Sequence, residues 1–141
     1  MQFIRSMAIA ALCLSLLAGC VTGPAAKPGL QGTWTVVAAE HEGKPMEVVL
    51  GGTLDVTGER FTIRTASGNQ LRGMLTVNTH SSPKEMDLVQ ENGTRWLAIY
   101  DLTDTLRINY VDAVCKEPRP KQFVTSDETE ASLMTLQRRK P

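Results

Sequence analysis

The sequence is poor in cysteine, histidine and aromatic residues. It has three cysteines and two histidines among 141 residues, and aromatic residues make up 5% of the chain. A zinc site needs three or four Cys, His or carboxylate ligands, and His41 and His80 have no further Cys or His at a useful spacing. We therefore expect no metal site, and we expect His41, between two glutamates beside a turn, to be solvated.

Motifs for catalysis or phosphate binding are also missing. The sequence contains no G-x-S-x-G nucleophile elbow and no phosphate-binding glycine loop. Asp101 and Asp104 flank an expected hairpin turn, where Asp is common. Cys115 has only Lys116 beside it to lower the pKa of its thiol, so we expect an inert thiol. We predict no catalytic residue and no cofactor, so the protein is not expected to be an enzyme.

The net charge of the chain does not favour a nucleic-acid partner. The chain has 15 basic and 15 acidic residues, a formal net charge of zero. Nucleic-acid binding depends on an excess of Lys and Arg that neutralises phosphates. We therefore expect no nucleic-acid partner.

The amino terminus reads as a secretion signal. Arg5 precedes an 11-residue stretch, residues 7–17, that is apolar except for Ser15. As a helix this stretch spans about 16 Å, against roughly 30 Å of hydrocarbon in a bilayer. It is too short for a stable transmembrane helix and is typical of the apolar region of a signal peptide.

The end of this signal, Leu17-Ala18-Gly19-Cys20, resembles the bacterial lipobox. In that family of signals the cysteine takes a diacylglyceryl group and the chain is cut just before it. The resemblance implies a cleaved signal peptide at residues 1–19 and a lipid on Cys20 that anchors the protein to a membrane without spanning it. Val21 stands where Asp would mark inner-membrane retention, which implies the periplasmic face of the outer membrane in a Gram-negative cell. The alternative is an ordinary cysteine in a cleaved signal.

Residues 20–29 (CVTGPAAKPG) have the Pro and Gly content of a flexible tether, and residues 30–141 form the expected domain. Loss of Cys13 with the signal and lipid on Cys20 leave only Cys115. The domain therefore cannot hold an internal disulfide.

The domain reads as short β segments separated by turn residues. In residues 60–64 (RFTIR), Phe61 and Ile63 alternate with polar residues, and Asn92-Gly93 is a hairpin signal. Residues 46–50 form one helical turn at most. The nine expected segments are residues 34–39, 53–56, 60–64, 71–77, 85–90, 95–102, 106–111, 122–125 and 133–138.

Short connections cannot make parallel crossovers, so these segments predict an all-β, antiparallel meander. A meander of this size either closes into a barrel or splits into a sandwich. About eight strands enclose an interior that side chains just fill, or one with room for a small ligand.

Gly32-Thr33-Trp34 opens the first segment and is similar to the Gly-x-Trp pattern of lipocalins and other calycin barrels. In that family the Trp plugs the closed end of the barrel, and an Arg late in the last strand packs across its ring. Here Arg138 or Arg139 occupies the corresponding place. The resemblance implies a lipocalin-like barrel of about eight strands, with Gly32, Trp34 and Arg138 as structural closure residues.

A longer pattern resembles a bacterial domain family of unknown function that recurs in secreted and lipid-anchored proteins, especially of planctomycetes, and is considered lipocalin-like. It includes LQGTWTVVAAEHEGKP, ERFTIR, LAIYDLTDTLRINY and RPKQFVTS, and it spans residues 30–140. The chain departs from it at VDAVCKEP, before Arg119. The likeness implies fold and location and carries no activity.

Two functions remain open. The first is a membrane-anchored, non-catalytic binding module for a small apolar ligand at the open end of the barrel. The second is a barrel that binds a periplasmic protein, as an inhibitor or a toxin-immunity lipoprotein. One set of aromatic side chains can line a ligand cavity or simply fill the core: Phe61, Trp96, Tyr100, Tyr110 and Phe123.

Overall fold

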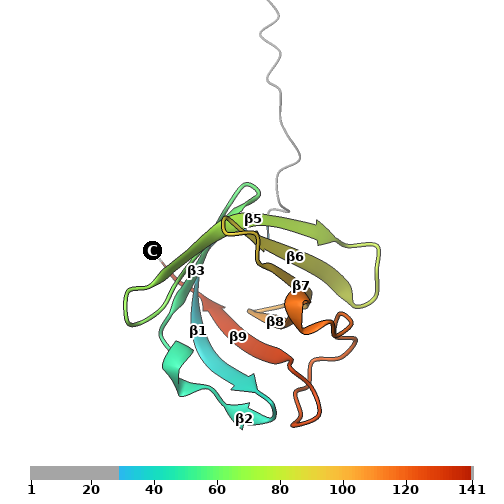
Figure 1. Cartoon of the computed structure of the whole chain (residues 1–141). Coiled ribbons are helices and arrows are strands. Elements are labelled where there is room, and N and C mark those ends of the chain that lie inside the picture. Colours follow the sequence, from blue (N-terminus) through green and yellow to red (C-terminus); the bar gives the residue numbers. More distant parts are fainter. Residues whose placement is uncertain (1–28, 141) are drawn as a thin grey trace, which may run out of the picture.

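The computed structural model describes residues 29–140, and within them one antiparallel sheet of nine strands closes into a barrel (Figure 1). The first strand, β1, pairs with the last, β9, so that eight strands form the wall and the two-residue β2 is appended to β1. The predicted all-β barrel of about eight strands is therefore confirmed. In chain order the elements are β1 Gly32–His41, β2 Lys44–Pro45, the 3-10 helix η1 Glu47–Val49, β3 Thr53–Thr57, β4 Arg60–Arg64, β5 Gln70–Asn78, β6 Lys84–Gln90, β7 Arg95–Leu102, β8 Thr105–Asp112, the 3-10 helix η2 Ala113–Cys115 and β9 Ser132–Arg138.

The closing ladder between β1 and β9 runs from the pair Trp34 and Arg138 to the pair His41 and Ser132. A bulge between Val36 and Ala38 shifts the register within it. Such bulges bend a strand and increase its twist, which closure of a barrel requires. Figure 1 shows β9, in red, lying alongside β1.

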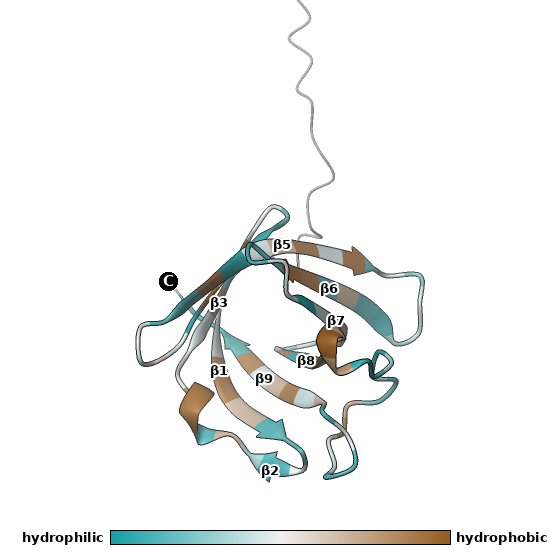
Figure 2. Ribbon diagram, in the orientation of Figure 1, coloured by the Kyte–Doolittle hydropathy of each residue, from teal (hydrophilic) through white to brown (hydrophobic). Residues whose placement is uncertain are grey.

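The inward-facing side chains form one apolar core. Apolar and polar residues alternate along the strands, so that every second side chain faces inward, as the alternating colours of β9 in Figure 2 show. The largest of them are almost fully buried and come from most of the strands: Trp34, Leu54, Phe61, Leu75, Met86, Leu88, Leu106, Ile108 and Leu136. Side chains therefore fill the centre of the barrel.

The turns follow the sequence signals in most places. At the predicted Asn92-Gly93 hairpin, the amide of Gly93 donates to the carbonyl of Gln90 at 2.9 Å, and the Asn92 side chain accepts from the amide of Thr94. The short η1 matches the single helical turn expected at residues 46–50.

One predicted segment is wrong: residues 122–125 form no strand. They belong to the connection between β8 and β9, residues 113–131, which is much longer than the short connections expected. The carbonyls of Gln122 and Val124 accept hydrogen bonds from the Asn109 side chain instead of from the backbone of a neighbouring strand. Glu42 and Gly43 form the turn after β1, and β2 then pairs briefly with Glu40 and His41.

Within residues 29–140 no helix is long and apolar enough to cross a membrane.

Candidate functional site

The β8–β9 connection crosses the outside of the barrel wall, and we call its residues 116–131 the strap. Beneath it, Ile99 and Val111 are 1% exposed although they do not belong to the inner core. Asn109, which is fully buried on the same strand as Val111, donates from Nδ2 to the carbonyls of Gln122 at 2.7 Å and Val124 at 2.9 Å. The strap therefore covers a small set of buried apolar side chains of its own, and the buried Asn109 side chain holds it to the wall by hydrogen bonds.

Arg119 fixes the other part of the strap to strands β6 and β7. Its guanidinium donates to the carbonyls of Met86 at 3.0 Å and Ala98 at 2.7 Å, and to the Asp87 carboxylate at 2.6 Å. Glu85 lies 3.7 Å from Nε of the same side chain. Because its donors meet several fixed acceptors, Arg119 is held in one position and works as an anchor.

Asp87 receives hydrogen bonds from two arginines, Arg95 and Arg119. Burial by itself raises the pKa of the Asp87 carboxyl. The hydrogen bonds and charges of Arg95 and Arg119 outweigh burial, and the pKa lies below its ordinary value of 3.8. The carboxylate is therefore a stable, charged partner for the strap.

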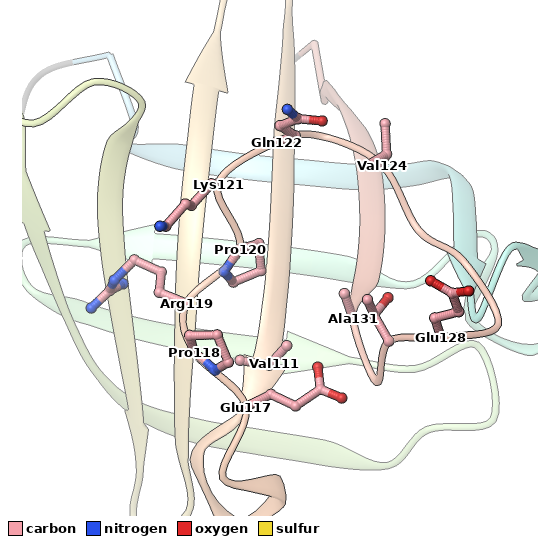
Figure 3. Close-up of a pocket in the computed structure, with 11 residues that line it drawn as sticks. Val111, Glu117, Pro118, Arg119, Pro120, Lys121, Gln122, Val124, Glu128 and Ala131 are labelled. Carbon is pink, nitrogen blue, oxygen red and sulfur yellow. The ribbon is translucent and has the colours of Figure 1, made fainter.

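Between the strap and the wall lies a cavity of about 550 Å³, which we call the strap pocket (Figure 3). Its lining is largely apolar, with two prolines from the strap and two buried side chains, Val111 from the wall and Ala131 from the end of the strap. The lining residues are Val111, Glu117, Pro118, Arg119, Pro120, Lys121, Gln122, Val124, Glu128, Thr129 and Ala131.

The charged groups of the strap pocket divide by position. Figure 3 shows the charged ends of Arg119 and Lys121 directed away from the ring of lining side chains, whereas Glu117 and Glu128 lie on the side nearer Ala131. The Glu117 carboxylate accepts hydrogen bonds from the backbone N–H of Glu130, which holds it in place. The pocket thus combines an apolar base with carboxylates on one side.

At one end of the barrel, the guanidinium of Arg138 lies 4.2 Å from the centre of the Trp34 ring. Trp34 is 1% exposed, and its Nε1 donates to the carbonyl of Leu30 at 3.0 Å. Gly32 has a φ of +114°, and a Cβ there would lie 2.9 Å from Nη1 of Arg138. The structure thus brings together Gly32, Trp34 and Arg138, the three residues that the sequence singled out for closure.

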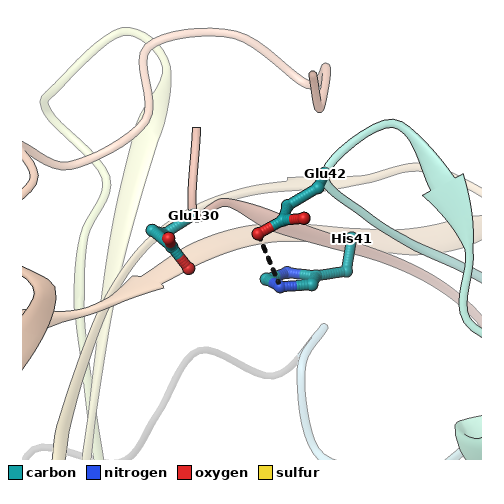
Figure 4. Close-up of side chains that lie close together, drawn as sticks. All are labelled: His41, Glu42 and Glu130. Atoms are coloured by element: carbon teal, nitrogen blue, oxygen red, sulfur yellow. Dashed lines mark ion pairs between the residues drawn. The ribbon is translucent and has the colours of Figure 1, made fainter. Parts of the chain in front are cut away.

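A second polar group gathers where the β1–β9 ladder ends. One donor atom each from His41, Glu42 and Glu130 lies within 4.8 Å of the others (Figure 4). His41 Nδ1 is 2.9 Å from the hydroxyl of Ser132, and its Nε2 is 3.7 Å from the Glu42 carboxylate. Burial, and then the charge of Asp112, raises the pKa of Tyr110 despite a hydrogen bond with Ser132.

The five aromatic residues considered for a ligand cavity do not share one lining. Phe61 and Tyr100 are buried in the inner core, and Trp96 stacks on Tyr110 with ring centres 4.4 Å apart. Phe123 lies apart from them in the strap, where the Arg107 guanidinium sits 4.6 Å from its ring centre. Phe61 and Tyr100 therefore belong to the core, and Trp96 and Tyr110 pack against it, in line with the interpretation that these side chains fill the core.

The remaining residues singled out from the sequence are scattered. Asp101 forms an ion pair with Arg107 at 3.0 Å, and Asp104 is exposed in the turn before β8. His80 is exposed in the connection between β5 and β6. Cys115 is an exposed thiol whose pKa is raised by desolvation and by the charges of nearby carboxylates, Glu130 first. Cys20 lies outside the described residues.

Sequence reasoning missed the strap pocket and the group around His41. Pro118 and Pro120 gave a signal, because two prolines flanking Arg119 favour an extended, non-pairing backbone. Glu130 and Ser132 gave none, since they meet His41 only through the pairing of β1 with β9.

No family model and no curated protein matches the sequence. Among solved structures, a de novo designed fluorescence-activating β-barrel is similar, with a TM-score of 0.50 and 12% sequence identity over 79% of this chain and 94% of that chain. A likeness at this identity shows the barrel fold alone. The bacterial lipoprotein assignment and the planctomycete domain family stay predictions.

Proposed function

We propose that this protein is a lipid-anchored, non-catalytic binding module of the cell envelope that takes a small apolar ligand into the strap pocket. The observation that carries the ligand-binding part is the cavity of about 550 Å³ between strap and barrel wall. Pockets for small ligands are mostly about 300–1,000 Å³ in volume, with an apolar lining and a few placed polar groups. The strap pocket has this size and this kind of lining.

The packing of the barrel supports a site outside the wall. Phe61, Leu75 and Leu88 belong to the inner core and are at most 2% exposed. A ligand entering between such side chains would have to displace them, and interiors packed to normal density resist this. We therefore place the ligand beneath the strap instead of at the open end of the barrel.

The charged residues around the pocket indicate which charge a ligand can carry. Glu117 and Glu128 lie on one side of the lining, and Arg119 is already engaged by strands β6 and β7. Carboxylates beside an apolar base disfavour an anionic group on the ligand and favour a neutral or positively charged one. The expected ligand is an apolar molecule that carries at most one neutral polar or positively charged group.

Binding is tested with the apolar fluorophore N-phenyl-1-naphthylamine, titrated into the purified protein and into two matched variants. Val124→Ser removes apolar surface from the pocket lining, whereas Val48→Ser makes the same change at an exposed valine of η1. We expect Val124→Ser to lose about 1 kcal/mol of apolar contact with the fluorophore and to bind it about fivefold more weakly, whereas Val48→Ser should bind it as the wild type does. Equal affinities in the two variants, or no binding at all, would overturn the pocket assignment.

The anchoring part rests on the Leu17-Ala18-Gly19-Cys20 sequence. In cells fed radiolabelled palmitate, we expect the wild-type protein to carry label and to fractionate with membranes. Cys20→Ala should carry none and accumulate as an unprocessed or soluble form. A Cys20→Ala protein that still carries acyl label would refute the lipid anchor without affecting the pocket.

The alternative function, binding of a periplasmic protein as an inhibitor or immunity protein, has support of its own. Val48 in η1 and Val114 in η2 are each 77% exposed, so each leaves an apolar side chain available to a partner protein. A photo-crosslinking amino acid at position 114 tests this in intact cells. A discrete adduct with an envelope protein, together with absence of fluorophore binding, would favour the alternative.

A further inference from the structure

We propose that His41, Glu42 and Glu130 form a binding site for a divalent transition-metal ion of the zinc type. One imidazole nitrogen and two carboxylate oxygens lie within 4.8 Å of one another and their side chains converge in Figure 4. Ligands bound at about 2.0–2.2 Å to a tetrahedral ion lie about 3.4 Å apart, so the groups need to approach by roughly 1 Å. Both glutamate side chains are at least partly exposed and have the freedom to do so.

The donor set selects the type of metal. One imidazole and two carboxylates leave a fourth position for water, which suits Zn²⁺. Ca²⁺ takes six to eight oxygen ligands, and Mg²⁺ keeps its waters and prefers oxygen. The nitrogen of His41 therefore favours a transition metal over these two ions.

A residue outside the group orients the imidazole. Ser132 is only 6% exposed, and its hydroxyl lies 2.9 Å from Nδ1 of His41. The hydroxyl of Tyr110 in turn hydrogen-bonds Ser132. Metal-binding histidines almost always use their second ring nitrogen in this way, which fixes the ring and directs the free nitrogen to the ion.

Nε2, the nitrogen left for a ligand, faces the Glu42 carboxylate across a long ion pair (Figure 4). Its distance of 3.7 Å to the Glu42 oxygen is beyond hydrogen-bond reach. A nitrogen and two acidic side chains thus face a shared space that a cation would fill with shorter contacts to all three.

The site joins segments that are far apart in the sequence. His41 ends β1, Glu42 begins the turn to β2, and Glu130 lies in the strap just before β9. The backbone N–H of Glu130 is held by the Glu117 carboxylate. A bound metal would fasten the end of the strap to the barrel, so metal binding should raise the thermal stability of the protein. This inference does not depend on the proposed strap pocket.

The test is a calorimetric titration of ZnCl₂ into the full chain, purified in detergent without a polyhistidine tag, with thermal unfolding measured in parallel. We expect one ion per chain and a rise in the melting temperature. His41→Gln, Glu130→Gln and Ser132→Ala should each weaken binding about tenfold or more. The matched controls His80→Gln and Glu47→Gln change the same residue types at exposed positions elsewhere and should leave binding unchanged.

Cys115→Ser separates this site from simple thiol binding, because Cys115 lies within electrostatic reach of Glu130. It should leave zinc affinity unchanged. Unfolding curves recorded without metal show whether each variant is folded. Absence of zinc binding, equal loss in the His41 and His80 variants, or loss in Cys115→Ser would overturn the proposal.

Discussion

Arg138 covers the indole of Trp34, with 4.2 Å between the guanidinium carbon and the ring centre. The same guanidinium donates to the carbonyls of Gly29 and Gln31, and Trp34 donates to the carbonyl of Leu30. The last strand therefore holds the segment that leads into the first strand. One cation–π contact and the backbone acceptors around it thus join the end of β9 to the segment before β1.

Trp34→Ala should destabilise the protein by about 3–5 kcal/mol, because the ring is 1% exposed and its loss leaves a cavity in the core. Urea unfolding followed by circular dichroism measures the change. Trp96→Ala is the control, since Trp96 is only partly buried and should cost less. A loss below about 1 kcal/mol for Trp34→Ala would show that the ring does not plug the barrel.

Arg138→Ala should cost about 1–2 kcal/mol through loss of the contact with the Trp34 ring and of two hydrogen bonds. Arg139→Ala removes the neighbouring charge, whose side chain is exposed, and should change the free energy of unfolding by less than about 0.5 kcal/mol. A double-mutant cycle between Arg138→Ala and Trp34→Leu isolates the cation–π contact. A coupling energy near zero, or equal losses in the two arginine variants, would contradict the assignment.

The barrel could be predicted from the sequence because its determinants are local. Alternation such as that of Phe61 and Ile63, and turn residues such as Asn92-Gly93, define strands and hairpins without reference to distant parts of the chain. The error at residues 122–125 has a non-local cause. Their apolar residues resemble a strand, yet Asn109 takes the carbonyls and Arg107 covers Phe123 from the barrel wall.

The candidate sites could not be predicted in the same way. His41 and Glu42 are neighbours in the sequence, but Glu130 and Ser132 reach them only because β1 pairs with β9 in a particular register. The strap pocket likewise exists only once the strap lies on the wall. Apart from the two prolines that flank Arg119, spacing along the chain carries no information about either arrangement.

Asp87→Asn should destabilise the protein at pH 7 by about 1–2 kcal/mol, because Arg95 and Arg119 lose a charged acceptor. The folded-state pKa of Asp87 lies below its ordinary value of 3.8. The carboxylate therefore contributes stability that is complete above this value and is lost as the pH falls through the lower, folded-state pKa.

Urea unfolding of wild type and Asp87→Asn between pH 7 and pH 2 checks this dependence. The difference between them should stay constant down to about pH 4 and then shrink. Asp104→Asn, at an exposed turn, is the matched control and should show little difference at any pH. A difference that grows on acidification would mean that burial, instead of the two arginines, dominates at Asp87.

Asn109→Ala should loosen the strap more than it weakens the barrel. The substitution leaves the carbonyls of Gln122 and Val124 without their buried donor, and lifting the strap into water restores their hydrogen bonds. We expect hydrogen exchange in residues 117–128 to accelerate about tenfold or more, while amides of β3 to β6 change little. Asn109→Asp should be worse, because a carboxylate cannot donate to the two carbonyls and its charge would be buried. If exchange instead rose equally in the strap and in the barrel strands, the strap would unfold only with the whole domain, and Asn109 would not be a separate attachment of the strap to the wall.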